Sequence, residues 1–144
     1  MTDTIEKLND TLTNMLNRDV NLIDWTSQPA PGKWSKKQII GHLIDSAQIN
    51  LQRFVRCTYQ ENFKLTYDQV EWVEAQRYQQ ADAEELLNLW NLLNRQIIRV
   101  WENYPEDRLM IKCDNSKTTE SPHTVEWLAA DYVEHMRHHL KQFD

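Results

Sequence analysis

The stretch that decides the fold closes the chain: Val125-Glu-Trp-Leu-Ala-Ala-Asp-Tyr-Val-Glu-His-Met-Arg-His-His-Leu-Lys-Gln-Phe143. Read as a helix, it carries one line of side chains at spacings of three and four residues: Val125, Leu128, Tyr132, His135 and His139. The neighbouring line is apolar throughout: Ala129, Val133, Met136, Leu140 and Phe143. The two lines make one broad stripe, which predicts a long helix with one face buried.

Two of the five histidines, His135 and His139, lie on this stripe. They are four residues apart, about one helical turn, so both imidazoles can point at the same spot. His138 falls on a different line, at the edge of the stripe, and its role stays open. The pair is a candidate half of a metal site.

Composition indicates a soluble helical protein. The 144 residues suit a single domain, residues 1–144, and 40% hydrophobic with 26% charged residues is ordinary for a globular chain. Only two glycines and four prolines leave little turn chemistry, which favours long helices over many strands. The net charge of −6 and the lack of a basic cluster argue against nucleic acid as a partner. The sequence has no run of about 18 apolar residues, the length that would predict a membrane span.

The cellular compartment is predicted from two further features. The N-terminus lacks a basic segment followed by an apolar one, as a secretory signal would have. Cys57 and Cys113 have no partner nearby in sequence and match no CxxC pattern, which favours a reducing compartment. We therefore expect a cytoplasmic protein.

Four amphipathic segments predict an all-α fold, a bundle of four helices. The second begins at the capping-box pattern Ser35-Lys-Lys-Gln38 and the third after Asp82. For the other two, more than one start is open: Thr2 or Asp3 for the first, Ser121 or Thr124 for the last. The amphipathic pattern of the first helix weakens near Asn17, and the third helix ends near Tyr104.

Two connections have weaker patterns. Residues 60–81 are predicted as a loop with short helical pieces, folded over one end of the bundle. This connection is long enough to cross the bundle, so an up-down-up-down order is not forced. Residues 106–121 are polar, except for a patch at Leu109-Met-Ile111 that can be a short strand or a hairpin arm.

A third histidine, His42, borders the buried face of the second helix and can complete a metal site. Three histidines around one ion, with open positions left for water, are typical of catalytic rather than structural zinc. Such an ion lowers the pKa of a bound water or thiol. The competing hypothesis is that these histidines lie at the core edge and bond to backbone carbonyls or to Tyr132.

Other candidates surround these histidines. Asp45 lies one turn from His42 and Asp131 one turn from His135, so either can orient a ligand by accepting its second N–H, or can be a solvated surface carboxylate. Four aromatic residues are candidates for lining a substrate pocket, although burying helix ends is the common use of such residues: Trp34, Tyr67, Trp72 and Tyr78.

Two segments resemble the DinB/YfiT-like superfamily. The segment Pro31-Gly-Lys-Trp-Ser-Lys-Lys-Gln-Ile-Ile-Gly-His-Leu-Ile-Asp45 is similar to the entry into that family's second helix, where Trp-Ser precedes His-Leu-x-Asp. The closing His135-Met-Arg-His-His139 is similar to its terminal motif. The resemblance covers essentially the whole chain. It implies an up-down-down-up bundle that holds a divalent metal, zinc or nickel, through His42, His135 and His139.

The resemblance also implies a function. Characterised relatives include S-transferases that use bacillithiol, mycothiol or glutathione, and several relatives are dimers. We therefore expect a metal-dependent enzyme, most simply a thiol S-transferase that acts on small electrophilic molecules, and a homodimer. The alternatives are a metal-dependent hydrolase that uses a metal-bound water, a non-catalytic metal- or ligand-binding stress protein, and a structural bundle with packed histidines.

Overall fold

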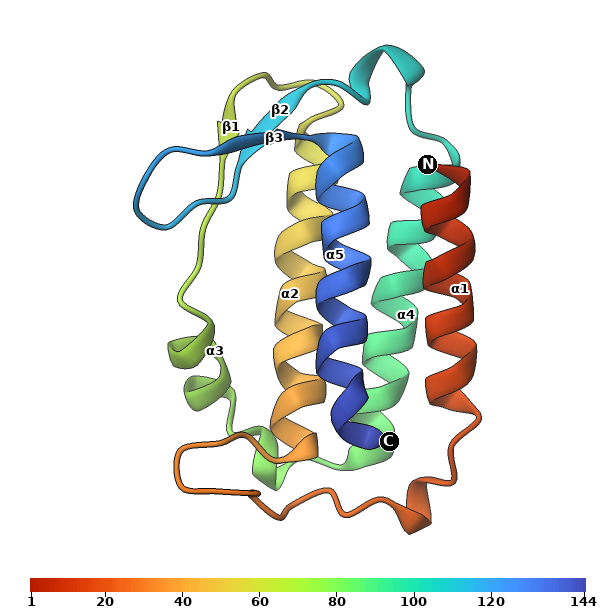
Figure 1. Cartoon of the computed structure of the whole chain (residues 1–144), viewed down its shortest axis with the longest axis vertical. Helices are drawn as coiled ribbons and strands as arrows, with labels where there is room; N and C mark the ends of the chain where they lie inside the picture. The colour runs from red at the N-terminus through yellow and green to blue at the C-terminus, as the bar shows by residue number, and fades with distance from the viewer.

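Four long helices stand side by side in the computed structural model, which describes residues 1–144 (Figure 1). They are α1 (Thr2–Leu16), α2 (Lys36–Arg56), α4 (Ala83–Glu102) and α5 (Val125–Leu140). Each helix contacts two others, in the cyclic order α1, α4, α2, α5. In Figure 1, α1 and α5 run downwards, whereas α2 and α4 run upwards. The predicted all-α bundle with up-down-down-up topology is therefore confirmed.

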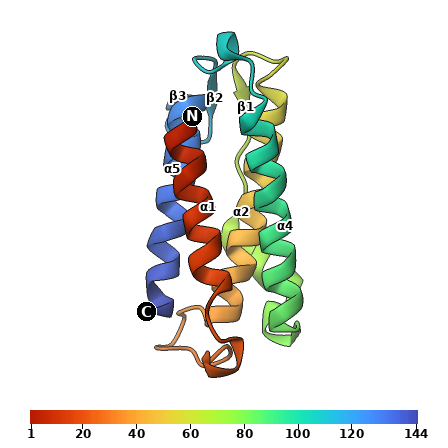
Figure 2. The same ribbon diagram turned by 90° about the vertical axis from the view of Figure 1, so that its right-hand side faces the viewer.

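The core runs along the bundle axis and is filled by all four long helices. Figure 2 shows α1 lying across the junction between α5 and α4. Fully burying one large apolar side chain stabilises a fold by about 1.5–3 kcal/mol. Each long helix contributes such side chains: Leu8 and Leu12, Ile40 and Ile44, Trp90 and Ile97, and Val133 and Met136.

The structure confirms the predicted starts of α2, α4 and α5. The Ser35 hydroxyl accepts a hydrogen bond from the Gln38 backbone N–H at 3.2 Å, and Gln38 Oε1 accepts one from the Ser35 N–H at 2.9 Å. Asp82 caps α4, and Thr124 rather than Ser121 caps α5. These caps satisfy N–H groups that have no partner within the helix.

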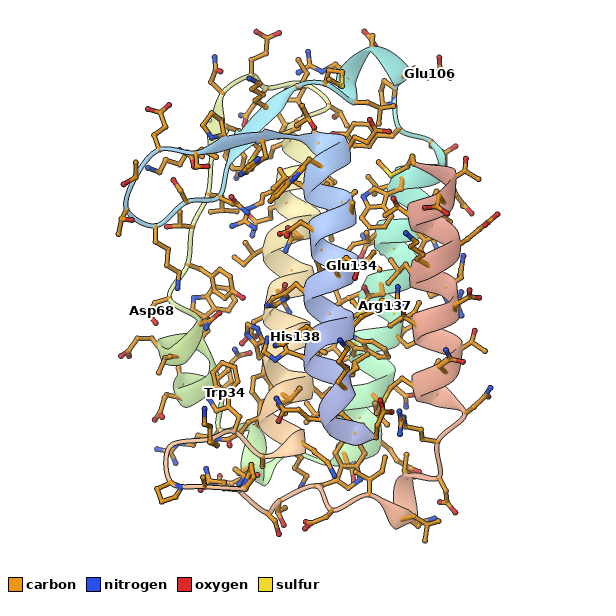
Figure 3. All side chains as sticks on the ribbon, in the orientation of Figure 1. Trp34, Asp68, Glu106, Glu134, Arg137 and His138 are labelled. Carbon is orange, nitrogen blue, oxygen red and sulfur yellow. The ribbon has the colours of Figure 1, made fainter.

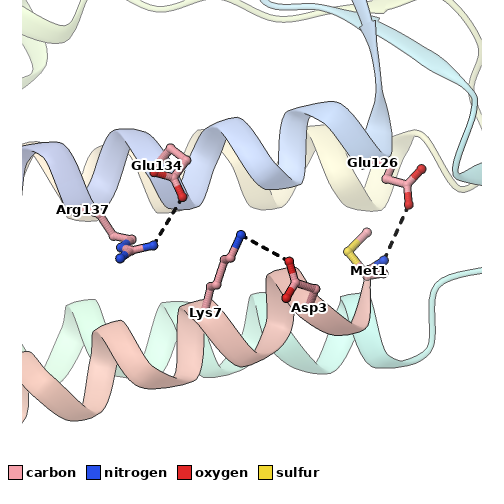
Figure 4. Close-up of polar contacts among 6 residues, drawn as sticks. All are labelled: Met1, Asp3, Lys7, Glu126, Glu134 and Arg137. Atoms are coloured by element: carbon pink, nitrogen blue, oxygen red, sulfur yellow. Dashed lines mark hydrogen bonds and ion pairs between the residues drawn. The ribbon is translucent and has the colours of Figure 1, made fainter.

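The first helix starts differently from the prediction. Met1 is its N-cap, and neither Thr2 nor Asp3 supplies a capping side chain. The amino group of Met1 instead lies 3.6 Å from Glu126 Oε1 on α5 (Figure 4). Exposed pairs of this kind contribute about 0–1 kcal/mol, so the buried stripes hold α1 against α5.

The connection between α2 and α4 crosses the length of the bundle. It contains β1 (Phe63–Lys64), α3 (Gln69–Gln76) and the 3-10 turn η2 (Tyr78–Gln80). Both α3 and η2 contact α2. The expectation that this connection folds over one end of the bundle is wrong, because α2 and α4 are parallel neighbours. The chain must therefore return along the side of α2 before α4 can begin.

A small sheet closes the end of the bundle where α5 begins. Its order is β1, β2 (Lys112–Asp114), β3 (Pro122–Thr124), with β1 parallel to β2 and β2 antiparallel to β3. The expected hairpin arm exists, but it starts just after Ile111 rather than within 109–111. Three more 3-10 turns complete the chain: η1 (Val20–Leu22), η3 (Glu106–Arg108) and η4 (Lys141–Phe143).

Two further features bear on the predictions. Cys57 at the end of α2 and Cys113 on β2 are both buried, and the Cys113 thiol hydrogen-bonds to Cys57, which lowers the pKa of Cys57. The two cysteines are thus neighbours in space, although the sequence shows no pairing. None of the helices combines the length and the apolar composition needed to cross a bilayer.

Candidate metal centre

The histidines singled out in the sequence meet between α2 and α5. The early part of α2 carries His42 and the last turns of α5 carry His135 and His139, and both lie toward the same end of the bundle because the helices are antiparallel. His135 Nε2 lies 3.4 Å from His42 Nε2 and 3.2 Å from His139 Nε2. One ring nitrogen from each of the three histidines therefore faces a common point.

This spacing fits a metal ion. Two imidazole nitrogens bound tetrahedrally to one zinc ion at 2.0–2.1 Å lie roughly 3.3 Å apart. The two measured separations, 3.4 and 3.2 Å, bracket that value. One ligand atom from each of the three histidines lies within 4.8 Å of the other two, so the three side chains could hold one ion.

Electrostatics keeps the imidazoles neutral, which is the form that binds metal. Burial, together with the neighbouring His139 and His135, lowers the pKa of His42 to about 3. Burial also lowers the pKa of His139 to about 4, and it lowers the pKa of His135. At neutral pH all three nitrogens can offer a lone pair.

The hypothesis of packed histidines requires other hydrogen-bond partners. Nδ1 of His42 and Nδ1 of His139 are buried without any partner. The Tyr132 hydroxyl donates to Asn94 Oδ1 at 2.7 Å and not to a histidine. Buried polar atoms of native proteins are seldom left unpaired unless a site uses them. The partners that the packing hypothesis requires, a backbone carbonyl or Tyr132, are therefore missing, and the Nε2 atoms face the common point instead.

Two aromatic neighbours flank the cluster. The ring of Trp34, in the segment that leads into α2, lies 4.9 Å from the His42 ring, tilted by 36° (Figure 3). His138 is exposed on α5, with its ring 5.8 Å from the His139 ring. His138 offers no nitrogen to the common point, so it lies outside the cluster.

The predicted orienting carboxylates do not bond to the histidines. Asp45 is buried, and its Oδ1 accepts hydrogen bonds from the Tyr78 hydroxyl at 2.6 Å and from Gln76 Nε2 at 2.7 Å. Burial raises the pKa of this carboxyl. Asp131 is exposed and makes no hydrogen bond to His135. The orienting role for either residue is therefore absent from this structure.

A cavity of about 160 Å³ opens beside His135. Its walls come from α2, the crossover, the loop between β2 and β3, and α5. Of the four predicted pocket aromatics, Tyr67 lines this cavity, and Trp72 packs edge-on against Tyr67 at 5.4 Å. Burial raises the pKa of Tyr67 to about 12, so the cavity wall there is a neutral hydroxyl.

Tyr78, another of the predicted pocket aromatics, does not line this cavity. Tyr78 is buried against the backbone of α2, where a Cβ added at Gly41 would lie 2.0 Å from its ring. Its hydroxyl serves the buried carboxylate of Asp45. Tyr78 therefore belongs to the packing between the crossover and α2.

Sequence reasoning missed the polar wall of the cavity, formed by Ser46, Asn50 and Arg53. All three are buried on α2. A signal was available, because they continue the line of His42 at helical spacings of four, four and three residues. Polar residues repeated along an otherwise buried helix face indicate a solvated or ligand-filled site.

The DinB superfamily model matches residues 5–143. The chain belongs to the DinB superfamily. Among proteins with curated descriptions, none matches this DinB-superfamily chain in sequence.

Solved structures share the fold. YfiT from Bacillus subtilis, described as a probable metal-dependent hydrolase with an unusual four-helix-bundle topology, superposes with a TM-score of 0.81 at 20% identity over 98% of this chain and 80% of YfiT. A mycothiol-dependent maleylpyruvate isomerase gives a TM-score of 0.70 at 14% identity over 94% of this chain. This chain spans only 59% of the isomerase. At these identities the likeness establishes the fold alone.

Proposed function

We propose that this protein is a metal-dependent enzyme that transfers a low-molecular-weight thiol to a small electrophilic substrate. The observation that carries the proposal is the convergence of three neutral imidazole nitrogens, where one of the three histidines, His135, also lines a polar cavity. A bound zinc or nickel ion supplies Lewis acidity, which lowers the pKa of a thiol or a water that reaches it. The mycothiol-dependent isomerase with the same fold supports the choice of a thiol.

The histidines, Trp34 and the cavity have separate roles in this proposal. His42, His135 and His139 would hold the ion, and burial keeps these side chains neutral. Trp34 covers the His42 ring, so the substrate enters from the cavity next to His135. In the transfer the thiolate sulfur forms a bond to the electrophilic carbon, whose leaving group departs with the bonding electrons, and the thiol proton goes to solvent.

A hydrolase is the second candidate, since the same histidines would serve when water takes the place of the thiol. The description of YfiT as a probable metal-dependent hydrolase favours it. The two candidates differ in one requirement, because only the transferase needs a thiol for turnover.

Metal analysis of untagged protein is the first test. We expect about one zinc or nickel ion per chain, lost in His42→Ala and His139→Ala. His138→Ala is the matched control and should keep its metal, because His138 points away from the common point. Wild-type protein that stays metal-free after reconstitution would contradict the proposal.

Activity assays then separate the two candidates. The metal-loaded protein is incubated with an electrophilic aryl halide and with bacillithiol, mycothiol or glutathione, and the thioether product is measured. Turnover that requires one of these thiols and is lost in His139→Ala supports the transferase. Ester cleavage without any thiol, lost in the same variant, would replace it with the hydrolase.

A further inference from the structure

The cavity beside His135 contains a buried cation with no carboxylate in direct contact. Arg53 on α2 is only 6% exposed, yet no carboxylate lies within 4 Å of its guanidinium. By contrast, Arg18, Arg108 and Arg137 each pair with an acidic group. Buried charges are normally paired, because desolvating an unpaired ion costs several kcal/mol. The chain has a net charge of −6, so acidic partners are plentiful, and the reason why Arg53 has none in contact must lie in its own surroundings.

The guanidinium is held in place by neutral oxygens. Its Nε and Nη2 donate to the Leu65 carbonyl at 3.1 and 2.6 Å, and its Nη1 donates to Asn50 Oδ1 at 3.2 Å. Asn50 is itself fixed, since its Nδ2 donates to the Ser46 carbonyl at 2.9 Å. A guanidinium has five N–H groups, so one N–H on each terminal nitrogen remains free. Free N–H donors on a planar guanidinium are suited to carboxylate oxygens, which accept such bonds.

The other charges in the cavity set the charge of the ligand. Lys117, on the loop between β2 and β3, and Asp131, on α5, line the same cavity and are exposed. With His135 neutral, two cations and one carboxylate leave a single positive charge. This balance, counted without a bound ion, favours an anionic ligand.

We infer that the cavity is a carboxylate subsite, in which Arg53 binds the carboxylate of a small substrate and directs its other end towards His135 and the histidine cluster. The inference rests on the proposed function for the identity of the reacting end. The anion site itself is independent of the metal. Arg53 is then a specificity-determining residue, and substrates without a carboxylate lose affinity.

The test is an NMR titration of the isotopically labelled full chain with sodium butyrate, at constant ionic strength, with and without bound zinc. Butyramide, the neutral isostere, is the control ligand. We expect butyrate to shift the amide signals around the cavity, and Arg53→Gln to weaken binding by at least about tenfold, the loss typical of a charged hydrogen bond. Arg95→Gln, on α4 and bonded to Asn9, is the matched control and should bind butyrate as wild type does.

Two exposed variants keep the test decisive if Arg53→Gln fails to fold. Lys117→Gln should weaken butyrate binding and Asp131→Asn should strengthen it, each by about two- to fivefold. Equal binding of butyrate and butyramide, or unchanged affinity in both variants, would overturn the subsite. So would butyrate binding that disappears with the metal, because that carboxylate binds the ion. Metal content, measured separately, reports on the proposed function and not on the subsite.

Discussion

The histidine cluster lowers the stability of the folded chain. Two of its buried ring nitrogens, Nδ1 of His42 and Nδ1 of His139, have no hydrogen-bond partner, and each such atom costs about 1–3 kcal/mol. Neighbouring imidazoles further disfavour protonation of His42. An ion at the common point would bind the Nε2 atoms, so these Nδ1 atoms need another partner, such as an ordered water.

The pH dependence of the metal-free protein follows from these shifts. The pKa values of His42, His135 and His139 are lower in the folded chain than their usual 6.5, so below about pH 6.5 the unfolded chain binds more protons. The contribution of the three neutral histidines to the free energy of unfolding is therefore complete above about pH 6.5. It decreases as the pH falls from there towards 4. Asp45 acts in the opposite sense, because its raised pKa favours the folded state on protonation.

Urea unfolding of metal-free protein at about pH 7.5 and about pH 5 measures this dependence. Replacing the three histidines by glutamine should flatten the profile, whereas His138→Ala should change it much less, because His138 adds only a secondary effect to the lowered pKa values of His135 and His139. A triple variant that keeps the wild-type slope would show that other groups cause it.

Gly41 is a second position where a single atom matters. A Cβ there would lie 2.0 Å from Cδ2 of Tyr78, so Gly41→Ala must displace the ring and weaken its bond to Asp45. We expect a loss of about 1–3 kcal/mol in the free energy of unfolding, the usual cost of overpacking. Urea titration checks this, and adding Tyr78→Leu to Gly41→Ala should recover part of the loss. A Gly41→Ala protein as stable as wild type would contradict the packing described here.

Among the elements, α2 contributes the most to the site. Its capped start fixes Trp34 and His42, and its buried polar line continues to Arg53. Ser35 does more than cap the helix, because its hydroxyl also donates to Gln79 Oε1 in the crossover at 2.7 Å. The same side chain therefore joins the start of α2 to the end of the segment that walls the cavity.

Ser35→Ala should lower the free energy of unfolding by about 1–2 kcal/mol, since it removes an N-cap and a buried hydrogen bond. Chemical denaturation measures the change. Ser27→Ala, in the exposed part of the same loop, is the control and should stay within about 0.5 kcal/mol of wild type. A Ser35→Ala protein inside that range would show that Gln38 and the backbone satisfy the helix start alone.

The elements also show what the sequence could predict. The stripes of α2 and α5 have a clear helical period, so both helices and the relative placement of His135 and His139 were predictable. The path of the crossover was not, because residues 60–81 have no strong period and their position follows from tertiary contacts with α2. The position of Tyr78 is an example, because its burial depends on the missing side chain at Gly41, a contact 37 residues away in the chain.

At the scale of the whole molecule, topology creates the site. Parallel α2 and α4 require a crossover, and the crossover brings Tyr67 to the cavity beside His135. Antiparallel α2 and α5 bring the third histidine to the other two. An up-down-up-down bundle with short loops would lack this wall. The expected homodimer stays a prediction, to be checked by light scattering.

Metal binding should therefore stabilise the whole bundle, because the ion would connect α2 to α5 only in the folded chain. Zinc at about 100 times its dissociation constant should raise the free energy of unfolding by about 2.7 kcal/mol. For a chain of this size that corresponds to a rise in Tm of roughly 5–10 °C. Differential scanning calorimetry with zinc, and again after chelation, measures the shift.

The controls for this last prediction come from neighbouring residues on one helix. His138→Ala should show the wild-type rise in Tm, because His138 contributes no nitrogen to the common point. His135→Ala should show none, since His135 Nε2 is the atom that lies close to both other ligands. An equal rise in both variants would mean that zinc binds elsewhere on the surface. The bundle would then owe its stability to its apolar stripes alone, and the three histidines would need another explanation.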